Sequence, residues 1–166
     1  MLRSPSLIPL SHQHQHGLAL CVLIDRGLRG DPSDATVKRL HRQLRSTLET
    51  ELTHHFQVEE RILFPAVRDI IASPNLVDDL VKQHRKVEKI AFLLTNAVGD
   101  KKITLLREFA ELLSGHIRIE ERCLSQEIQS KLSVNQLAEI GSKVDENLRR
   151  VCPASGGLPW EKSKVR

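Results

Sequence analysis

The sequence is poor in aromatic residues and in cysteine. Its 166 residues include four Phe, one Trp, no Tyr and three Cys, so a core built from this chain must be mainly aliphatic. Cys21, Cys123 and Cys152 are widely spaced and form no C-x-x-C pair. That spacing argues against a disulfide scaffold and predicts reduced thiols in a cytoplasmic protein.

Long hydrophobic runs are also missing. The longest extends from Leu18 to Ile24, far short of the roughly 20 apolar residues that a membrane-spanning helix needs. Near the N-terminus, the apolar stretch 7–10 contains Pro9 and is followed by polar residues. A signal peptide would need a continuous apolar region there. We therefore expect a soluble protein with neither a membrane partner nor an export signal.

Charge of either sign is not in large excess. Lys and Arg number 25 against 21 Asp and Glu, a net charge of +4. The basic residues are mixed with acidic ones, as in the stretch 118–122, and aromatic residues do not alternate with them. Single-strand binders need such aromatic residues for base stacking. This pattern predicts a solvated helical surface and no nucleic-acid partner.

Apolar residues recur at helical spacing, and no stretch alternates as a β-strand does. Glycine, proline and capping residues divide the chain into five predicted helices. Pro65 lies within the second and is expected to bend it, because proline donates no backbone hydrogen bond. Ser73 and Pro74 are expected to begin the third, and Ser133 with Gln136 forms a capping box for the fifth. The predicted ranges are 11–28, 34–72, 74–99, 100–132 and 133–151.

Each of the second to fourth predicted helices has one apolar face with a histidine in it. Long helices with one apolar face and short connections predict an all-α fold, an up-down-up-down four-helix bundle with a short additional C-terminal helix. The three faces are Leu48, Leu52, His55, Glu59, Ile62 and Ala66; Val77, Leu80, His84, Val87, Ala91, Leu94 and Val98; and Leu105, Phe109, Leu112, His116, Glu120, Cys123 and Glu127.

The fifth predicted helix has an apolar face of its own. This face either packs on the bundle or makes a contact in a homodimer. We expect the bundle domain to cover residues 1–152 and a flexible tail to cover 153–166, where glycine and proline are frequent. The residues of the fifth face are Leu137, Ile140, Val144, Leu148 and Val151.

Histidine and glutamate within aliphatic faces are the informative feature, because an unpaired buried polar group costs roughly 2–7 kcal/mol. Three histidines have a glutamate four residues later, one turn along the same side of a helix. Two of these pairs, His55 with Glu59 and His116 with Glu120, lie on the apolar faces. In the third pair His84 lies on the face, whereas Glu88 lies beside it. Glu88 is therefore expected near the site or at the surface.

The first predicted helix offers three further histidines, at positions 12, 14 and 16. Residues two apart on a helix point about 200° away from each other, so they cannot all face inward. The face through His14 continues through Leu10, Leu18, Cys21, Asp25 and Leu28 and spans the helix. We prefer His14 for that reason; His16 remains the alternative, on a shorter face. His41 and His54 lie off the apolar faces and are expected at the surface.

Four imidazoles and two carboxylates form a ligand set that suits first-row transition metals, especially iron. Calcium and magnesium sites use oxygen ligands almost alone, and six ligands are too many for one tetrahedral zinc ion. Two metal ions fit this set better. If Glu59 and Glu120 each bridge both ions, a bridging oxo or hydroxo group leaves one exchangeable position per ion for a small ligand.

The order H, H-x-x-x-E, H, H-x-x-x-E over residues 10–127 resembles the hemerythrin-like, or HHE cation-binding, domain. The stretches His55-Phe56-Gln57-Val58-Glu59-Glu60 and His116-Ile117-Arg118-Ile119-Glu120-Glu121 are particularly similar. The resemblance implies a site for two Fe ions. The ligands that it implies are His14, His55, Glu59, His84, His116 and Glu120.

One position separates this chain from the oxygen carriers of that family. Oxygen-carrying hemerythrins have H-x-x-x-H in the third helix, where this chain has His84 and Glu88. The pattern instead resembles bacterial di-iron proteins implicated in the repair of damaged iron centres. We expect a di-iron protein that binds or responds to O2, NO or peroxide, in sensing, storage or stress protection. The alternatives are a di-iron redox enzyme or repair protein, and a metal-free helical module that binds a partner.

Overall fold

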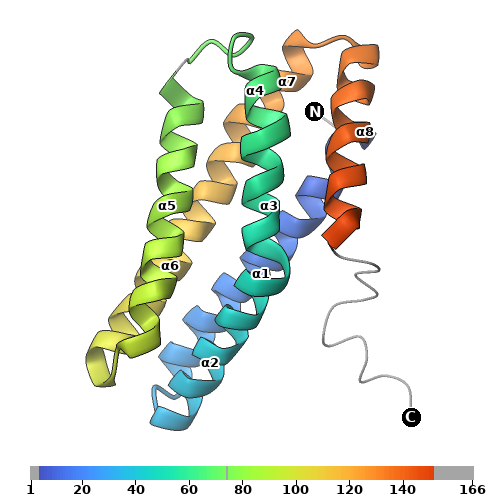
Figure 1. The fold of residues 1–166 in the computed structure, drawn as a ribbon. Coiled ribbons are helices and arrows are strands. Elements are labelled where there is room, and N and C mark those ends of the chain that lie inside the picture. Colours follow the sequence, from blue (N-terminus) through green and yellow to red (C-terminus); the bar gives the residue numbers. More distant parts are fainter. Residues whose placement is uncertain (1–3, 74, 152–166) are drawn as a thin grey trace, which may run out of the picture.

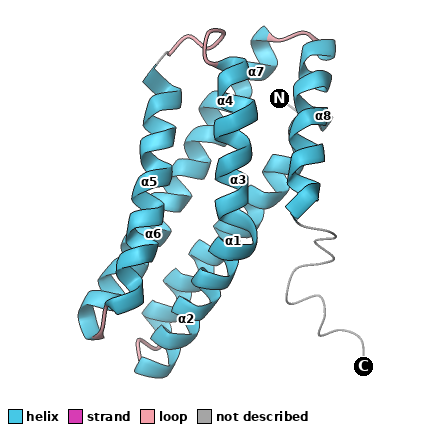
Figure 2. Cartoon of the chain, viewed as in Figure 1, coloured by secondary structure: helices cyan, strands magenta, loops and turns pink. Residues whose placement is uncertain are grey.

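The computed structural model describes residues 4–73 and 75–151, and within them the regular elements are all helices. Four long helical rods lie side by side, with a further helix packed against one half of the bundle (Figure 1, Figure 2). No helix in these two ranges combines the length and the apolar character needed to cross a membrane. The chain therefore forms a helical bundle, as its periodicity predicts.

Two rods are single helices, and two are built from segments that follow one another without a loop. After a short turn η1 (Pro5–Leu7), the first rod is α1 (Ile8–Gly30) and the third is α5 (Asn75–Asn96). α8 (Val134–Val151) is the additional helix. The second rod consists of α2 (Asp34–Thr47), η2 (Leu48–Leu52), α3 (Thr53–Val58), η3 (Glu59–Leu63) and α4 (Phe64–Val67). The fourth consists of α6 (Gly99–Ile119), η4 (Glu120–Leu124) and α7 (Ser125–Lys131).

Several helix ends differ from the predicted ones. α1 begins at Ile8 instead of residue 11. Pro9 is tolerated in the first turn, because backbone N–H groups there have no acceptor within the helix and the N–H that proline lacks is not needed. The second rod ends at Val67 and not at residue 72. Pro65 lies in the first turn of α4, directly after the π-helical turn η3. Pro74, the expected start of the third helix, lies outside the described residues.

The π-helical turns move the buried face of two rods by one residue. A π turn contains more residues than an α turn, so every side chain after it is rotated about the helix axis. After Glu59 the buried positions are Leu63 and Val67 in place of the predicted Ile62 and Ala66. After Glu120 they are Leu124 and Ile128 in place of Cys123 and Glu127. The predictions for Ala66 and Cys123, which are exposed, were wrong because they assumed uninterrupted α-helices, whereas Ile62 and Glu127 are half-buried.

The core consists of two aliphatic clusters at different heights of the bundle. Along α1, Leu10 belongs to one cluster and Leu20 to the other, with His14 between them. Along α5, Leu80 and Val87 are divided in the same way by His84. A layer of polar side chains therefore separates the two aliphatic clusters.

The apolar face of α8 packs on the chain's own bundle. Leu137, Val144 and Leu148 are buried in the cluster that also contains Leu7. The predicted alternative, in which this face makes a dimer contact, is therefore not observed. Cys21 is buried and Cys123 exposed. Cys152 and the expected tail 153–166 lie outside the described residues.

Candidate metal centre

Six buried polar side chains meet in the layer between the two aliphatic clusters. All six are at most 4% exposed, and they are the buried polar or charged residues of the described chain: His14, His55, Glu59, His84, His116 and Glu120. Their donor atoms form two groups of four, in each of which the atoms lie within 4.8 Å of one another. Glu59 and Glu120 belong to both groups.

The first group joins α1 to the second and fourth rods. Nε2 of His14 lies 3.0 Å from Nε2 of His55, 3.2 Å from Oε2 of Glu120 and 3.6 Å from Oε1 of Glu59. Nε2 of His55 lies 3.1 Å from the same Glu59 oxygen. Two imidazole nitrogens and two carboxylates therefore face one small volume.

The second group repeats this arrangement around α5. Nε2 of His84 lies 3.0 Å from Nε2 of His116 and 3.4 Å from Oε2 of Glu59. Nε2 of His116 lies 3.2 Å from Oε2 of Glu120. Since Glu59 directs one oxygen to each group, its carboxylate lies between the two volumes.

The outer nitrogen of each imidazole fixes the tautomer of its ring. Nδ1 of His14 donates to Glu121 Oε1 over 2.6 Å, and Nδ1 of His84 donates to Glu60 Oε1 over 2.8 Å. The Nδ1 atoms of the other two rings donate to side-chain amide oxygens, His55 to Gln13 over 2.8 Å and His116 to Gln83 over 3.0 Å. A neutral ring with its proton on Nδ1 has a lone pair on Nε2. All four lone pairs thus point into the cluster.

The outer acceptors reveal an internal repeat that the sequence analysis missed. Gln13 and Gln83 each directly precede a cluster histidine, and Glu60 and Glu121 each directly follow a shared carboxylate. The repeated dipeptides Gln-His and Glu-Glu were the available signal. η3 and η4 also both begin at a shared glutamate. Each half of the cluster is therefore built from one Gln-His and one His-x-x-x-Glu-Glu.

The shared carboxylates have no hydrogen bonds of their own. Within the described residues, all four carboxylate oxygens of Glu59 and Glu120 are buried and lack a hydrogen-bond partner, although Nε2 atoms lie nearby. Buried carboxylates are otherwise paired or bound to metal. Donors about 2.1 Å from one ion are about 3.0–3.4 Å apart at bond angles of 90–110°, close to the spacings observed. The residues therefore fit a pair of cations.

The pKa values indicate how this cluster is charged without metal. Burial lowers the pKa of His14, but Glu120 and Glu59 outweigh it and raise that pKa to about 9. Burial also lowers the pKa of His84, and Glu59 again outweighs it, so that this pKa is raised. Burial and Glu59 raise the pKa of Glu120, yet His116 and His14 prevail and lower it to about 2. The pKa of Glu59 is lowered as well, because imidazole contacts outweigh its burial. Both carboxylates stay ionised and attract cations.

Aromatic rings close the cluster on the side of the second rod. Phe56 stacks on His84 with ring centroids 3.9 Å apart and an angle of 16° between the planes. Phe56 and His116 also form a T-shaped pair, with ring centroids 5.8 Å apart. Phe64 lies on His84 as well, at 5.8 Å, and both phenylalanines are fully buried. These rings exclude water from the imidazoles and restrict their rotation.

The remaining polar candidates lie outside the cluster. His16 is half-buried and contacts Glu51 over 2.8 Å, so the structure brings His14 and not His16 into the cluster. Glu88 pairs with Arg85 over 2.8 Å. His54 was expected at the surface, but it is half-buried and its Nε2 donates to the backbone oxygen of Asn147 on α8.

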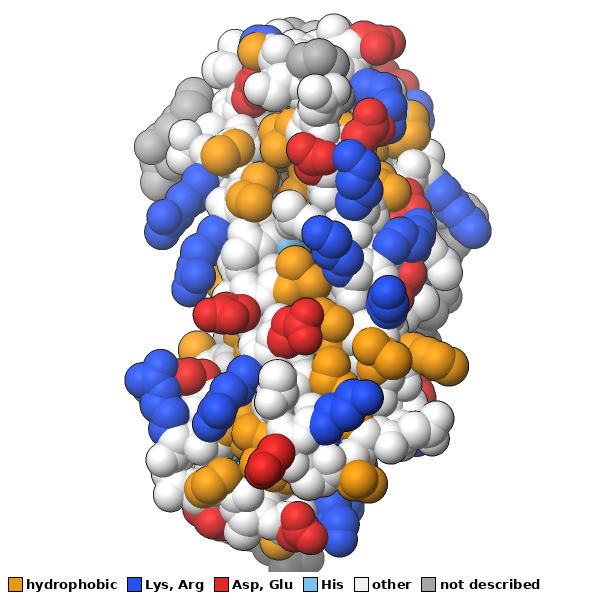
Figure 3. Space-filling model, turned by 90° about the vertical axis from the view of Figure 1, so that its left-hand side faces the viewer, with side chains coloured by type: hydrophobic (Ala, Val, Ile, Leu, Met, Phe, Trp, Pro, Cys, Tyr) orange, Lys and Arg blue, Asp and Glu red, His pale blue; other side chains and the backbone are white. Residues whose placement is uncertain are grey.

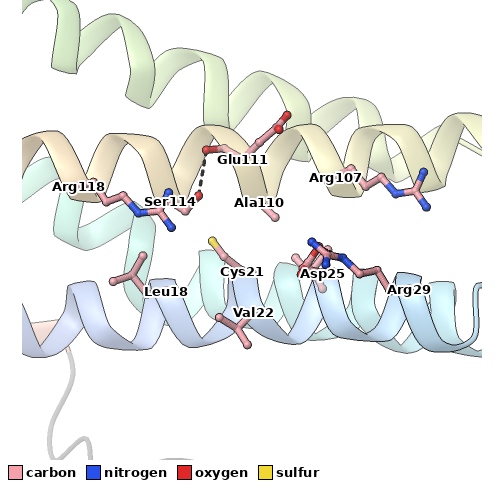
Figure 4. Close-up of a pocket in the computed structure, with 11 residues that line it drawn as sticks. Leu18, Cys21, Val22, Asp25, Arg29, Arg107, Ala110, Glu111, Ser114 and Arg118 are labelled. Atoms are coloured by element: carbon pink, nitrogen blue, oxygen red, sulfur yellow. Dashed lines mark hydrogen bonds and ion pairs between the residues drawn. The ribbon is translucent and has the colours of Figure 1, made fainter.

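A separate pocket of about 570 Å³ lies between α1 and α6 (Figure 4). Its lining includes Cys21, Ala110, Ser114 and arginines from both helices, but none of the six cluster residues. Burial raises the pKa of the Cys21 thiol to about 12, so this sulfur is uncharged at neutral pH. The pocket therefore adds no ligand to the cluster.

Comparison with known proteins gives one match. The family model described as "Hemerythrin HHE cation binding domain" matches residues 9–128, which include all six cluster residues. No curated protein and no solved structure matches the chain.

Proposed function

The chain belongs to the hemerythrin HHE cation-binding domain family, and on this premise we propose that it is a non-haem di-iron protein that binds or responds to O2, NO or peroxide. The observation that carries the proposal is the pair of carboxylates shared by two groups of donors. The four buried carboxylate oxygens make no hydrogen bonds as they stand, so a metal-free bundle would need added protons on the facing imidazoles to compensate them.

Each ion would be held by two imidazoles and by oxygens of both carboxylates. His14 and His55 would hold one ion, and His84 and His116 the other, with Glu59 and Glu120 bridging. Nitrogen and oxygen donors in this mixture suit iron. When bound, two irons joined by an oxo or hydroxo group supply redox chemistry and an exchangeable position for a small ligand.

The chain's own residues prepare the site for this ligand set. Acceptors at Nδ1 keep each imidazole turned with its Nε2 lone pair inward, as in most histidine metal sites. Phe56 and the two aliphatic clusters keep bulk water away. The space left between the donors is small, and this favours diatomic ligands and peroxide over organic substrates.

The proposal includes the topology and the location of the protein. We take the four rods as an up-down-up-down bundle, which the contacts of α1 with α2 and α6 and of α5 with α6 support. We place the protein in the cytoplasm, which the free thiols of Cys21 and Cys123 support.

Metal analysis of the purified protein tests the proposal. We expect about two irons per chain and absorption in the near ultraviolet from oxo-to-iron charge transfer. Addition of NO to the reduced protein, or of peroxide or O2, should change that spectrum, whereas zinc-loaded protein should not respond. Assays of peroxide and NO consumption then separate binding from turnover. A chain that is isolated without metal and gains no stability from iron would contradict the proposal.

A further inference from the structure

A surface groove of about 700 Å³ runs between α5 and α6 on the side of the bundle shown in Figure 3. Leu93 and Leu112 provide apolar lining, and Leu93 is 41% exposed. An exposed apolar lining that is flanked by charged side chains is typical of an interaction surface.

The charged residues of this groove are divided by helix. Lys86 and Lys89 come from α5, and Glu108 and Glu111 come from α6. All four are exposed, and none of them takes part in an ion pair within the described parts of the chain. One edge of the groove is therefore positive and the other negative.

We propose that this groove is the interface of a symmetric dimer with a second copy of the chain, related by a two-fold axis parallel to the helices. Rotation about this axis leaves the two ends of the bundle at the same height in both copies, but it reverses the lateral order of α5 and α6. It places α6 of each copy opposite α5 of the other. Glu108 and Glu111 of each copy then face Lys86 and Lys89 of the other copy. Two sets of opposite charges therefore flank the apolar lining.

The charges exclude the other simple arrangement. A two-fold axis perpendicular to the helices would set α5 against α5 and α6 against α6. Two lysines would then face two lysines, and two glutamates would face two glutamates. Like charges brought together in an interface oppose binding. The distribution of charge therefore selects both the partner and its orientation.

Charge-reversal variants test this interface, with analytical ultracentrifugation of the metal-loaded full chain as the measurement. The wild type is expected to dimerise at micromolar concentration, and its dimer is expected to dissociate more readily as the salt concentration is raised. The variant K86E/K89E makes both edges negative, and E108K/E111K makes both edges positive. Each alone should raise the dissociation constant at least about tenfold, since like charges now meet.

Mixing the two variants is the decisive step. In the mixed pair both halves of the interface oppose negative to positive, so a heterodimer is expected although neither variant dimerises alone. The fourfold variant K86E/K89E/E108K/E111K should recover the homodimer. As a control, K143E/R149E reverses two charges on α8, away from the groove (Figure 1), and should leave the wild-type dissociation constant unchanged.

Three results would overturn the proposal: a wild type that stays monomeric at 100 micromolar in low salt, a dimer unaffected by either reversal, and a mixture that remains monomeric. Circular dichroism melting of each variant verifies that it is folded. Metal content is unaffected by these substitutions under the proposal, so the outcome is independent of the di-iron assignment.

Discussion

Nε2 of His84 lies 3.0 Å from Nε2 of His116, although each ring donates its Nδ1 proton outward, to Glu60 and to Gln83. When both imidazoles are neutral, the lone pairs on their Nε2 atoms therefore face each other. His14 and His55 face each other at the same distance. Cations or added protons must relieve this repulsion, and the two possibilities predict different behaviour.

Removal of metal should destabilise the bundle. If two ions link four rods, a chelator takes away binding energy that only the folded state gains, about 4 kcal/mol for each ion at a thousandfold excess of metal over its dissociation constant. For a chain of this size that corresponds to a fall in Tm of roughly 10 °C for each ion removed. Calorimetry before and after treatment with chelator measures it. An unchanged Tm would favour protons as the compensating charge.

Substitution of one histidine in each group should abolish most metal binding. The double variant H55Q/H116Q removes one imidazole from each ion and is expected to lower the iron content from about two per chain to well below one. H12Q/H41Q alters two histidines outside the cluster and should retain full metal content. Elemental analysis compares the two. Equal metal content in both would place the metal elsewhere.

The outer carboxylates should tune metal affinity without binding metal themselves. Glu60 and Glu121 accept the Nδ1 protons of His84 and His14. Loss of such an acceptor typically weakens metal binding 10- to 100-fold. We expect that range for E60A and E121A, and a smaller loss for E60Q and E121Q, which keep an acceptor oxygen. Competition with a chromogenic chelator measures the affinities.

Metal uptake should release protons, because metal and proton compete for the same imidazole nitrogens. In the metal-free protein the pKa of His14 is raised from 6.5 to about 9. His14 is then protonated at pH 7 and must lose its proton to bind metal. Metal affinity should therefore rise with pH up to about 9. A pH indicator in weak buffer records the release, and H14Q should release fewer protons per ion bound.

The raised pKa of His14 also predicts how the stability of the metal-free protein depends on pH. A histidine whose pKa is raised on folding stabilises the folded state fully below pH 6.5, and the effect is lost as pH rises through about 9. Tm of the metal-free chain should fall over this interval. The metal-loaded chain, in which the proton has been replaced, should not show that fall.

Close packing of α8 depends on the absence of a side chain at Gly141. A Cβ atom there would lie 2.6 Å from the backbone oxygen and 2.8 Å from Cα of Ser6. G141A should therefore displace α8 and cost about 1–3 kcal/mol, while metal content is kept. Gly115 has open space around its Cβ position, so G115A is a matched control that should not destabilise the chain. Denaturant unfolding compares them.

Much of the fold and of the candidate site could be predicted from the sequence. The spacing of His55 and Glu59, and of His116 and Glu120, is local, since four residues make about one helical turn whatever surrounds them. The apolar faces showed which side of each helix turns inward. The convergence of all six residues followed once these faces were packed together. Their role as ligands stays a prediction for the experiments above.

Errors in the predicted buried faces arose where an α-helix was assumed without interruption, and also at Val98, which is 79% exposed because α5 already ends at Asn96. Cys123 and Glu127 were expected to be buried, but the π turn that begins at Glu120 replaces them by Leu124 and Ile128. The same change after Glu59 exposes Ala66. Periodicity is counted along an ideal helix, so one extra residue in a turn changes the phase of everything after it.

The sequence by itself determined the helices, the aliphatic core and the two His-x-x-x-Glu pairs, because these depend on residue type and on spacing within one turn. Only the tertiary structure decided between His14 and His16, supplied the acceptors Gln13, Gln83, Glu60 and Glu121, and packed α8 on its own bundle. Those relationships join residues far apart in the chain. Their geometry is set by how helices pack against one another, and local signals such as the Gln-His and Glu-Glu dipeptides do not by themselves specify it.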